Sequence, residues 1–271
     1  EKDRSQTMSA TANKTPIILA ASGTATAAAD TYDRIEARCR QAFPGHPIHW
    51  AYSSRAIRRR IHARTGEAPP TPANRLDHLY ASGGRNAVVQ SLHLICGIEF
   101  HHLVWEAARR PMEIQLGLPL LSTPEDFESL LDWIAAVQPS GSHEALVLVG
   151  HGTEHPAWMT YALLAQMITA RFGRRIVVGQ VKGDPSPAVV GERLLAAGCR
   201  RVTLRPLMVV AGAHFMADIA GEQAGSWQTQ LSQRGLAVTS VAEGLGAHPA
   251  LIDIFMRHIA AAMKSRPLDL D

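Results

Sequence analysis

Short apolar runs alternate with amphipathic stretches along most of the chain. Residues 17–21 are apolar and are followed by Ser22 and Gly23, which is typical of a buried strand that ends in a turn. Residues 25–43 repeat apolar side chains at intervals of three and four, which predicts a helix. The same reasoning predicts further strands at residues 49–52, 87–95, within 111–119, and at 145–149, 175–181, 201–210 and 236–241. It predicts further helices at residues 55–64, 75–81, 100–110, 124–137, 158–172, 186–197, 218–234 (mostly helical) and 249–263. This alternation predicts parallel sheets that helices cover on both faces.

A Pro-Ser-Gly-Ser segment at residues 139–142 is the best candidate for a linker between domains. The order of strands and helices repeats after it. We therefore predict an α/β fold of two doubly wound domains with parallel sheets, at residues 15–138 and 143–265, after a disordered tail at residues 1–14. In such sheets, ligands gather at the carboxyl ends of the strands.

The second predicted domain repeats part of the first. Residues 83–100 align without a gap with residues 198–215, and both segments carry glycine, leucine and phenylalanine at matching positions. Glu99 in the first copy lies opposite His214 in the second. An internal repeat of this kind predicts two halves that are related by pseudo-symmetry.

A further pair of similar segments lies upstream in each half. Residues 16–24 resemble residues 145–153, and Ser22 there lies opposite His151. Both repeats end a predicted strand in a turn, which places metal-binding side chains at matching strand ends beside a cleft between the halves.

The overall composition is that of a globular protein. With 271 residues, of which 46% are hydrophobic, the chain can form one large core or two ordinary ones. Its 27 basic residues nearly balance 24 acidic ones, so the net charge of +3 indicates no nucleic-acid partner. No apolar run reaches the roughly 18–20 residues of a membrane span. The three widely spaced cysteines exclude a disulfide framework.

The polar segment from Glu1 to Lys14 bears on the compartment. We expect a mature exported protein that is periplasmic after removal of a signal peptide. The alternative is a cytoplasmic protein whose own start is Met8.

One strongly basic segment, RAIRRRIHAR, occupies residues 55–64. Such runs most often form the solvated face of a helix. The alternative is a surface for a ligand that carries many carboxylates. The arginines concerned are Arg55, Arg58, Arg59 and Arg60.

Two histidines follow predicted strands in the second half. His151 lies between Gly150 and Gly152 after an apolar run, and His214 follows Ala-Gly-Ala at residues 211–213. The glycines allow a tight turn that exposes the ring, and neutral imidazole is a common metal ligand and proton acceptor. A single histidine there can instead brace the turn, but two at neighbouring strand ends favour a chemical role.

The first half contributes further candidates. Glu99 follows Gly97, and a carboxylate that faces two imidazoles suits a divalent first-row metal; the alternative is a carboxylate that the helix macrodipole favours. His93 lies in an apolar strand, either as a hydrogen-bonded structural histidine or as an axial ligand of a haem or tetrapyrrole. His101 and His102 are expected on the helix surface.

Several common enzyme classes lack their motifs here. The sequence contains no nucleophile elbow, P-loop, H-E-x-x-H motif or dinucleotide fingerprint. Histidine-based phosphoryl transfer requires an arginine directly before the histidine, and Gly150 occupies that position.

Five segments of the chain form a recognisable set: GHGTEH at residues 150–155, PLMVVAGAH at 206–214, Gly221-Glu222, Ser226-Trp227 and GLG at 244–246. Together they resemble the anaerobic cobaltochelatase family, whose members insert Co²⁺ into sirohydrochlorin in cobalamin synthesis and share the class II chelatase fold with ferrochelatases. The resemblance runs from about residue 15 through nearly the whole chain. It implies two flavodoxin-like domains with a tetrapyrrole in the cleft, in a homo-oligomer. It also makes His151 and His214 the metal-site histidines and Glu99 a carboxylate from the first half.

Two positions depart from the family pattern. Lys182 stands where the family usually has a glutamate, and a cationic lysine is a poor metal ligand. Lys182 is expected to weaken metal binding unless Glu99 or Asp184 substitutes. Ala213 stands where an acidic residue commonly precedes the histidine.

The expected function is therefore that of a sirohydrochlorin cobaltochelatase, a lyase with Co²⁺, and also Fe²⁺, as substrate metal. His151 and His214 are the expected catalytic residues, and Arg55, Arg58 and Arg59 the expected contacts of the substrate carboxylates. The alternative is a haem- or metal-binding carrier on the same scaffold, with His93 as the haem ligand.

Overall fold

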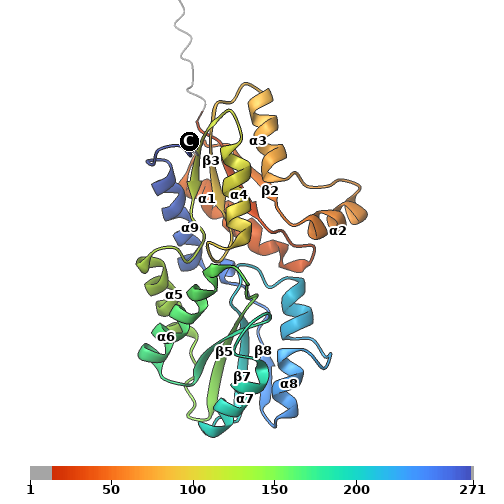
Figure 1. Cartoon of the computed structure of the whole chain (residues 1–271), viewed down its shortest axis with the longest axis vertical. Helices are drawn as coiled ribbons and strands as arrows, with labels where there is room; N and C mark the ends of the chain where they lie inside the picture. Colours follow the sequence, from red (N-terminus) through yellow and green to blue (C-terminus); the bar gives the residue numbers. More distant parts are fainter. Residues whose placement is uncertain (1–13, 270–271) are drawn as a thin grey trace, which may run out of the picture.

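The computed structural model describes residues 14–269, so the tail predicted at residues 1–14 lies, except for Lys14, outside the described residues. The described chain forms two four-stranded sheets in which every strand pair is parallel (Figure 1). The strands are β1 (Ile17–Ala21), β2 (Ile48–Tyr52), β3 (Asn86–Ser91), β4 (Glu113–Gly117), β5 (Glu144–Gly150), β6 (Ile176–Gln180), β7 (Arg201–Pro206) and β8 (Ala237–Ser240). Their orders, β2-β1-β3-β4 and β6-β5-β7-β8, are the same in both sheets.

Helices alternate with these strands and cover both faces of each sheet. The α-helices are α1 (Asp30–Ala42), α2 (Arg55–Thr65), α3 (Pro72–Ala81), α4 (Ile98–Ala108), α5 (Pro124–Val137), α6 (Met159–Phe172), α7 (Pro187–Ala196), α8 (Trp227–Gln233) and α9 (Pro249–Ala262). Short turns of other helix types are η1 (Ala27–Ala29), η2 (Pro156–Trp158), the π-helical η3 (Phe215–Ile219) and η4 (Leu245–Ala247).

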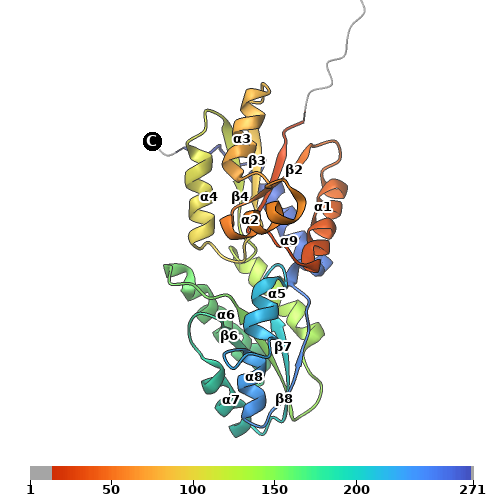
Figure 2. The same cartoon turned by 90° about the vertical axis from the view of Figure 1, so that its right-hand side faces the viewer.

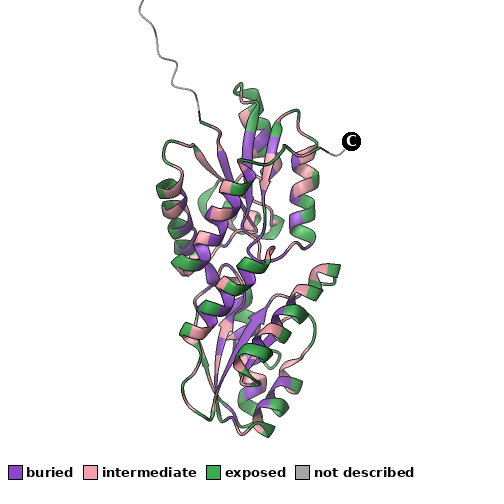
Figure 3. Ribbon diagram, turned by 90° about the vertical axis from the view of Figure 1, so that its left-hand side faces the viewer, coloured by how far each residue is buried: buried purple, intermediate pink, exposed green. Residues whose placement is uncertain are grey.

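The alternation of side chains along each strand divides the interior into three cores. Ile18 and Ala20 point into a core beneath α3 and α4, and Val147 into one beneath α7 and α8. Leu19 and Leu148 belong to the third and largest core, which continues from one sheet to the other through α5 and α9. Figure 3 shows the buried residues in the strands and on the helix faces that cover them.

Two helices near the junction contact the half of the molecule other than the one in which their sequence lies. The last helix, α9, packs on β3, β4 and α1 of the first sheet. Conversely, α5 lies at the boundary and reaches α6 of the second sheet, where Arg171 pairs with Glu128 and Asp132 (Figures 1 and 2). A division of the chain at residues 139–142 therefore separates the two sheets but not all of their helices.

Two strands end earlier than their apolar runs predict. β3 ends at Ser91 and β7 at Pro206. The residues that follow leave the parallel ladder and bond to loops instead: the Leu120 amide donates to the His93 carbonyl at 2.9 Å, and the Leu245 amide donates to the Met208 carbonyl at 2.8 Å. His93 consequently lies in the loop after β3 and not in a strand. The segment predicted as mostly helical, residues 218–234, is helical in two pieces: the end of a π-helical turn comes first, and α8 begins only after Gly221 and Gly225.

Within residues 14–269, no helix is long and apolar enough to cross a membrane.

A buried carboxylate ties α5 to α9. Asp126 is 1% exposed and accepts hydrogen bonds from the Thr123 amide at 2.8 Å and from His258 Nε2 at 3.0 Å, and it pairs with Arg257 at 3.4 Å. Burial alone would raise the pKa of Asp126, but the hydrogen bonds from His258 and Thr123 outweigh it and lower this pKa.

We expect Asp126→Ala to reduce the free energy of unfolding by about 3 kcal/mol, since it leaves buried donors without their acceptor. The control is Asp132→Ala, which breaks only the exposed pair with Arg171 and should cost less than about 1 kcal/mol. Urea denaturation measures both values. Equal losses in the two variants would show that the buried carboxylate is not a structural anchor.

Candidate functional site

The turn after β5 presents His151 at the carboxyl end of the second sheet. A Cβ atom on Gly150 would overlap the ring of Tyr161, and one on Gly152 would overlap the carbonyl oxygen of Lys182. Gly152 also has φ +79°, a conformation that other residues rarely adopt. Both glycines are therefore required for the path of the backbone around His151.

His214 lies at the start of the π-helical turn η3, after β7. Its Nδ1 atom is 2.7 Å from Asp218 Oδ2, four residues later. The π-helical turn brings this carboxylate under the ring and fixes its orientation. The sequence analysis did not identify Asp218, although the His-x-x-x-Asp spacing on a helical turn is a usable signal.

The two rings face each other. Their centroids are 4.5 Å apart, and the ring planes meet at 80°. His151 Nδ1 lies 3.1 Å from the Gly152 carbonyl oxygen, which can only accept, and His214 Nδ1 lies against a carboxylate. Both Nδ1 atoms are thus donors, so each neutral ring keeps the lone pair of Nε2 for a metal ion or a proton.

Burial lowers the pKa of His151 below its ordinary value of 6.5, and the nearby cationic forms of His214 and Lys182 act in the same direction. The hydrogen bond to Gly152 opposes this shift without cancelling it. The lowered pKa favours the neutral imidazole of His151, which can act as a ligand or a base.

Lys182 belongs to the same corner of the sheet. Its amide donates to the carbonyl of His151 at 3.0 Å, directly after the last residue pair of β5 and β6. The side chain is exposed. The structure thus places the lysine cation next to His151 of the imidazole pair. This is the position at which the sequence analysis noted a lysine in place of the glutamate that the family usually has.

The first domain has an equivalent corner with different residues. The Ser54 amide donates to the carbonyl of Ser22 at 3.3 Å, which reproduces the bond between Lys182 and His151. In the strand registers, Ile17 pairs with Ile48 as Leu146 pairs with Ile176, so Ser54 corresponds to Lys182. The repeat seen in the sequence therefore corresponds to equivalent positions in the two sheets.

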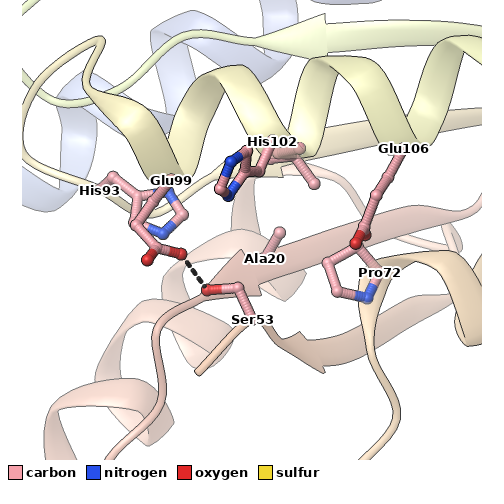
Figure 4. Close-up of a pocket in the computed structure, with 8 residues that line it drawn as sticks. Ala20, Ser53, Pro72, His93, Glu99, His102 and Glu106 are labelled. Atoms are coloured by element: carbon pink, nitrogen blue, oxygen red, sulfur yellow. Dashed lines mark hydrogen bonds between the residues drawn. The ribbon is translucent and has the colours of Figure 1, made fainter. Parts of the chain in front are cut away.

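Glu99 lies in the first domain and not beside the histidine pair. Its Oε2 atom accepts a hydrogen bond from Ser53 at 2.9 Å, at a cavity that His93 and His102 also line (Figure 4). Within residues 14–269, no three histidine, cysteine or acidic side chains are arranged to hold a metal ion. The role of Glu99 as a ligand together with His151 and His214 stays a prediction. His102 is exposed, as expected for the helix surface, and also lines this cavity.

A groove of about 560 Å³ lies between the domains. Ala211 and Met216, which lie on either side of His214 in the chain, line it, whereas His151 and His214 themselves do not. Thr26 and Arg34 line it from the first domain, and Met216 and Glu243 from the second. This volume lies within the roughly 300–1,000 Å³ of pockets for small organic ligands. Arg34 is a candidate for binding an anionic ligand that the sequence analysis missed, since an isolated arginine on a helix carries no signal.

The basic helix α2 packs beside the same groove and has no fully buried residue. Arg64 donates to the carbonyl of Ala25, in the loop that leads to the groove, and Ile57 approaches Gly23. Arg58 donates to the Pro69 carbonyl at 2.6 Å, so its guanidinium is partly used within the fold. Arg55 and Arg59, by contrast, are exposed.

Comparison with known sequences identifies the family of the chain. Residues 15–264 match the sequence profile of the family described as cobalt chelatase (CbiK). The chain belongs to the cobalt chelatase family. It is 35% identical to the sirohydrochlorin cobaltochelatase of Salmonella typhimurium over 225 residues, which cover 81% of this chain and 84% of that protein. It is 32% identical to the sirohydrochlorin cobaltochelatase CbiKC of Nitratidesulfovibrio vulgaris over 260 residues, or 93% of this chain and 92% of that protein.

Solved structures confirm the predicted chelatase fold of this family member. SirB from Bacillus subtilis with Fe³⁺ superposes with a TM-score of 0.63 at 14% identity, over 94% of this chain and all of SirB. DR2241 from Deinococcus radiodurans, described as structurally similar to chelatases, gives a TM-score of 0.58 at 14% identity, over 94% of this chain and 58% of DR2241. The expected enzyme class, a metal chelatase with cobalt as substrate, is confirmed by the family.

The charge of Lys182 provides a test of the site geometry. In the metal-free protein, Lys182→Glu should raise the pKa of His151, because it replaces a cation that lowers this pKa by an anion that raises it. Lys182→Met removes the charge alone and should give a smaller rise. NMR titration of the imidazole signals measures all three proteins, and one common midpoint would contradict the placement of Lys182.

Proposed function

We propose that this protein inserts Co²⁺ into sirohydrochlorin, with His151 and His214 as the residues that hold the metal and accept protons. The observation that carries the proposal is the pair of imidazoles at 4.5 Å beside a groove of about 560 Å³. Two relatives that are 35% and 32% identical are named for this reaction and support the choice of substrate.

Insertion exchanges two pyrrole N–H bonds for bonds to the metal, and two protons leave without any change of oxidation state. With Nδ1 protonated, His151 and His214 each have one Nε2 lone pair, which can bind the ion first and accept a pyrrole proton once the ion has passed to the macrocycle. Two ligands bind a metal ion less firmly than three or four, so the ion can pass to the macrocycle nitrogens. Because imidazole binds several first-row ions, we propose Fe²⁺ as a second substrate metal.

The groove between the domains is the proposed site of the macrocycle. Arg34 lines it, and the exposed Arg55 and Arg59 lie on the adjacent helix α2. The substrate carries many carboxylates, which these guanidinium groups can bind in pairs of hydrogen bonds. Arg58 already donates to the Pro69 carbonyl, so it contributes to substrate binding through its positive charge more than through hydrogen bonds.

A carrier of haem or metal on the chelatase scaffold is the second candidate function. The exposed cation of Lys182 next to His151 favours a haem carrier, because this charge opposes binding of a metal ion at the histidine pair. Haem ligation by His93 would require a rearrangement, since its Nε2 atom is buried at a cavity of only about 120 Å³.

Anaerobic incubation with sirohydrochlorin and Co²⁺, followed by absorbance, tests the proposal. We expect insertion by the unsubstituted protein and a loss of rate of at least about 100-fold in His151→Ala, in His214→Ala and in the double variant. His78→Ala, which removes an exposed histidine of α3, is the matched control and should keep the full rate. Absence of insertion, together with a Soret band that His93→Ala removes, would favour the carrier instead.

The arginines of α2 should affect substrate binding more than the chemical step. We expect Arg55→Ala/Arg59→Ala to raise KM for sirohydrochlorin several-fold with kcat unchanged, and the effect to shrink as salt screens the charges. The control is Arg174→Ala, an exposed arginine before β6 at the opposite end of the second sheet. A KM equal to that of this control would exclude α2 from the substrate site.

A further inference from the structure

The cavity of the first domain is lined with metal-binding groups that the proposed insertion reaction does not use. It has a volume of about 120 Å³ and lies between α4 and the ends of β1, β2 and β3 (Figure 4). His93, Glu99, His102 and Glu106 line it together with Ser53, and none of the lining residues is lysine or arginine. Two carboxylates without a basic partner make the cavity attractive to a cation.

His93 supplies the decisive observation. Its Nδ1 atom lies 2.8 Å from the hydroxyl of the fully buried Ser91, which can accept the Nδ1 proton and leave a lone pair on Nε2. That Nε2 atom is buried and has no hydrogen-bond partner among the described residues. An oriented imidazole with an unused buried nitrogen is arranged as a metal ligand is.

The other donors come from one helix. Glu99, His102 and Glu106 follow one another on α4 at intervals of three and four residues, which places them on the same face. Figure 4 shows Glu99 and His102 near His93, and Glu106 farther along the cavity beside Pro72. The spacing therefore places three donors on the face of α4 that lines the cavity, to which His93 also contributes.

We propose that this cavity binds a divalent first-row transition metal ion, with His93 as the anchoring ligand and Glu99 and His102 completing the protein ligands. Mixed imidazole and carboxylate donors suit this class of ion. The side chains do not yet surround one point, so binding turns Glu99 away from Ser53 and toward His93. The cavity has room for an ion and a few waters, each of which occupies about 30 Å³ in the liquid.

This second site is independent of the proposed insertion reaction, and its test uses binding as the readout. Removing the proposed insertion pair with His151→Ala/His214→Ala leaves a protein that should still bind one equivalent of Co²⁺. Isothermal titration calorimetry gives the stoichiometry, and the visible absorption of bound Co²⁺ reports imidazole ligands. We expect His93→Ala in this background to abolish binding and Ser91→Ala to weaken it about tenfold, through the lost orientation of the ring.

His78→Ala in the same background is the matched control and should bind Co²⁺ unchanged. Because His93 is partly buried, circular dichroism must show that each variant is folded. In the protein that keeps His93 and His102, paramagnetic shifts of their ring signals locate the bound Co²⁺ ion. The proposal is overturned if the double variant binds no Co²⁺, if His93→Ala still binds it, or if the ion shifts other histidines instead. None of these results bears on whether the unsubstituted protein inserts Co²⁺.

Discussion

The relative position of the two domains depends on the buried carboxylate of Asp126. This side chain lies in the first turn of α5 and bonds to His258 and Arg257 of α9. Since α5 contacts the second sheet through α6 and α9 contacts the first, the carboxylate joins the two layers of helices at the junction. The groove is lined by residues of both domains, which this interaction helps to hold together.

Two nearly identical frames carry different chemistry. Both sheets have the same strand order, and the same backbone hydrogen bond closes the corner after their first two strands. One corner carries Ser22 and Ser54, the other His151 and Lys182. The fold therefore supplies equivalent positions, and the side chains placed there decide which of the two corners presents imidazoles for a metal ion or a proton.

Most of the fold could be predicted from periodicity, because buried strands and amphipathic helices leave distinct patterns. Strand ends could not, since the apolar run beyond Pro206 continues into a loop that is buried by distant residues. The approach of His151 and His214 followed from neighbouring strand ends. The position of Glu99 beside Ser53, and of His102 in a cavity, depends on how α4 lies over the sheet. No local pattern records that contact.

The exchange of helices between the halves also sets an order of events during synthesis. The sheet formed by the first 117 residues lacks one of its covers until α9, at residues 249–262, has left the ribosome. Until then, apolar residues of β1 and β3 that belong to the largest core remain without that cover. The first domain is thus translated first, but its core is fully covered only after α9 has been translated.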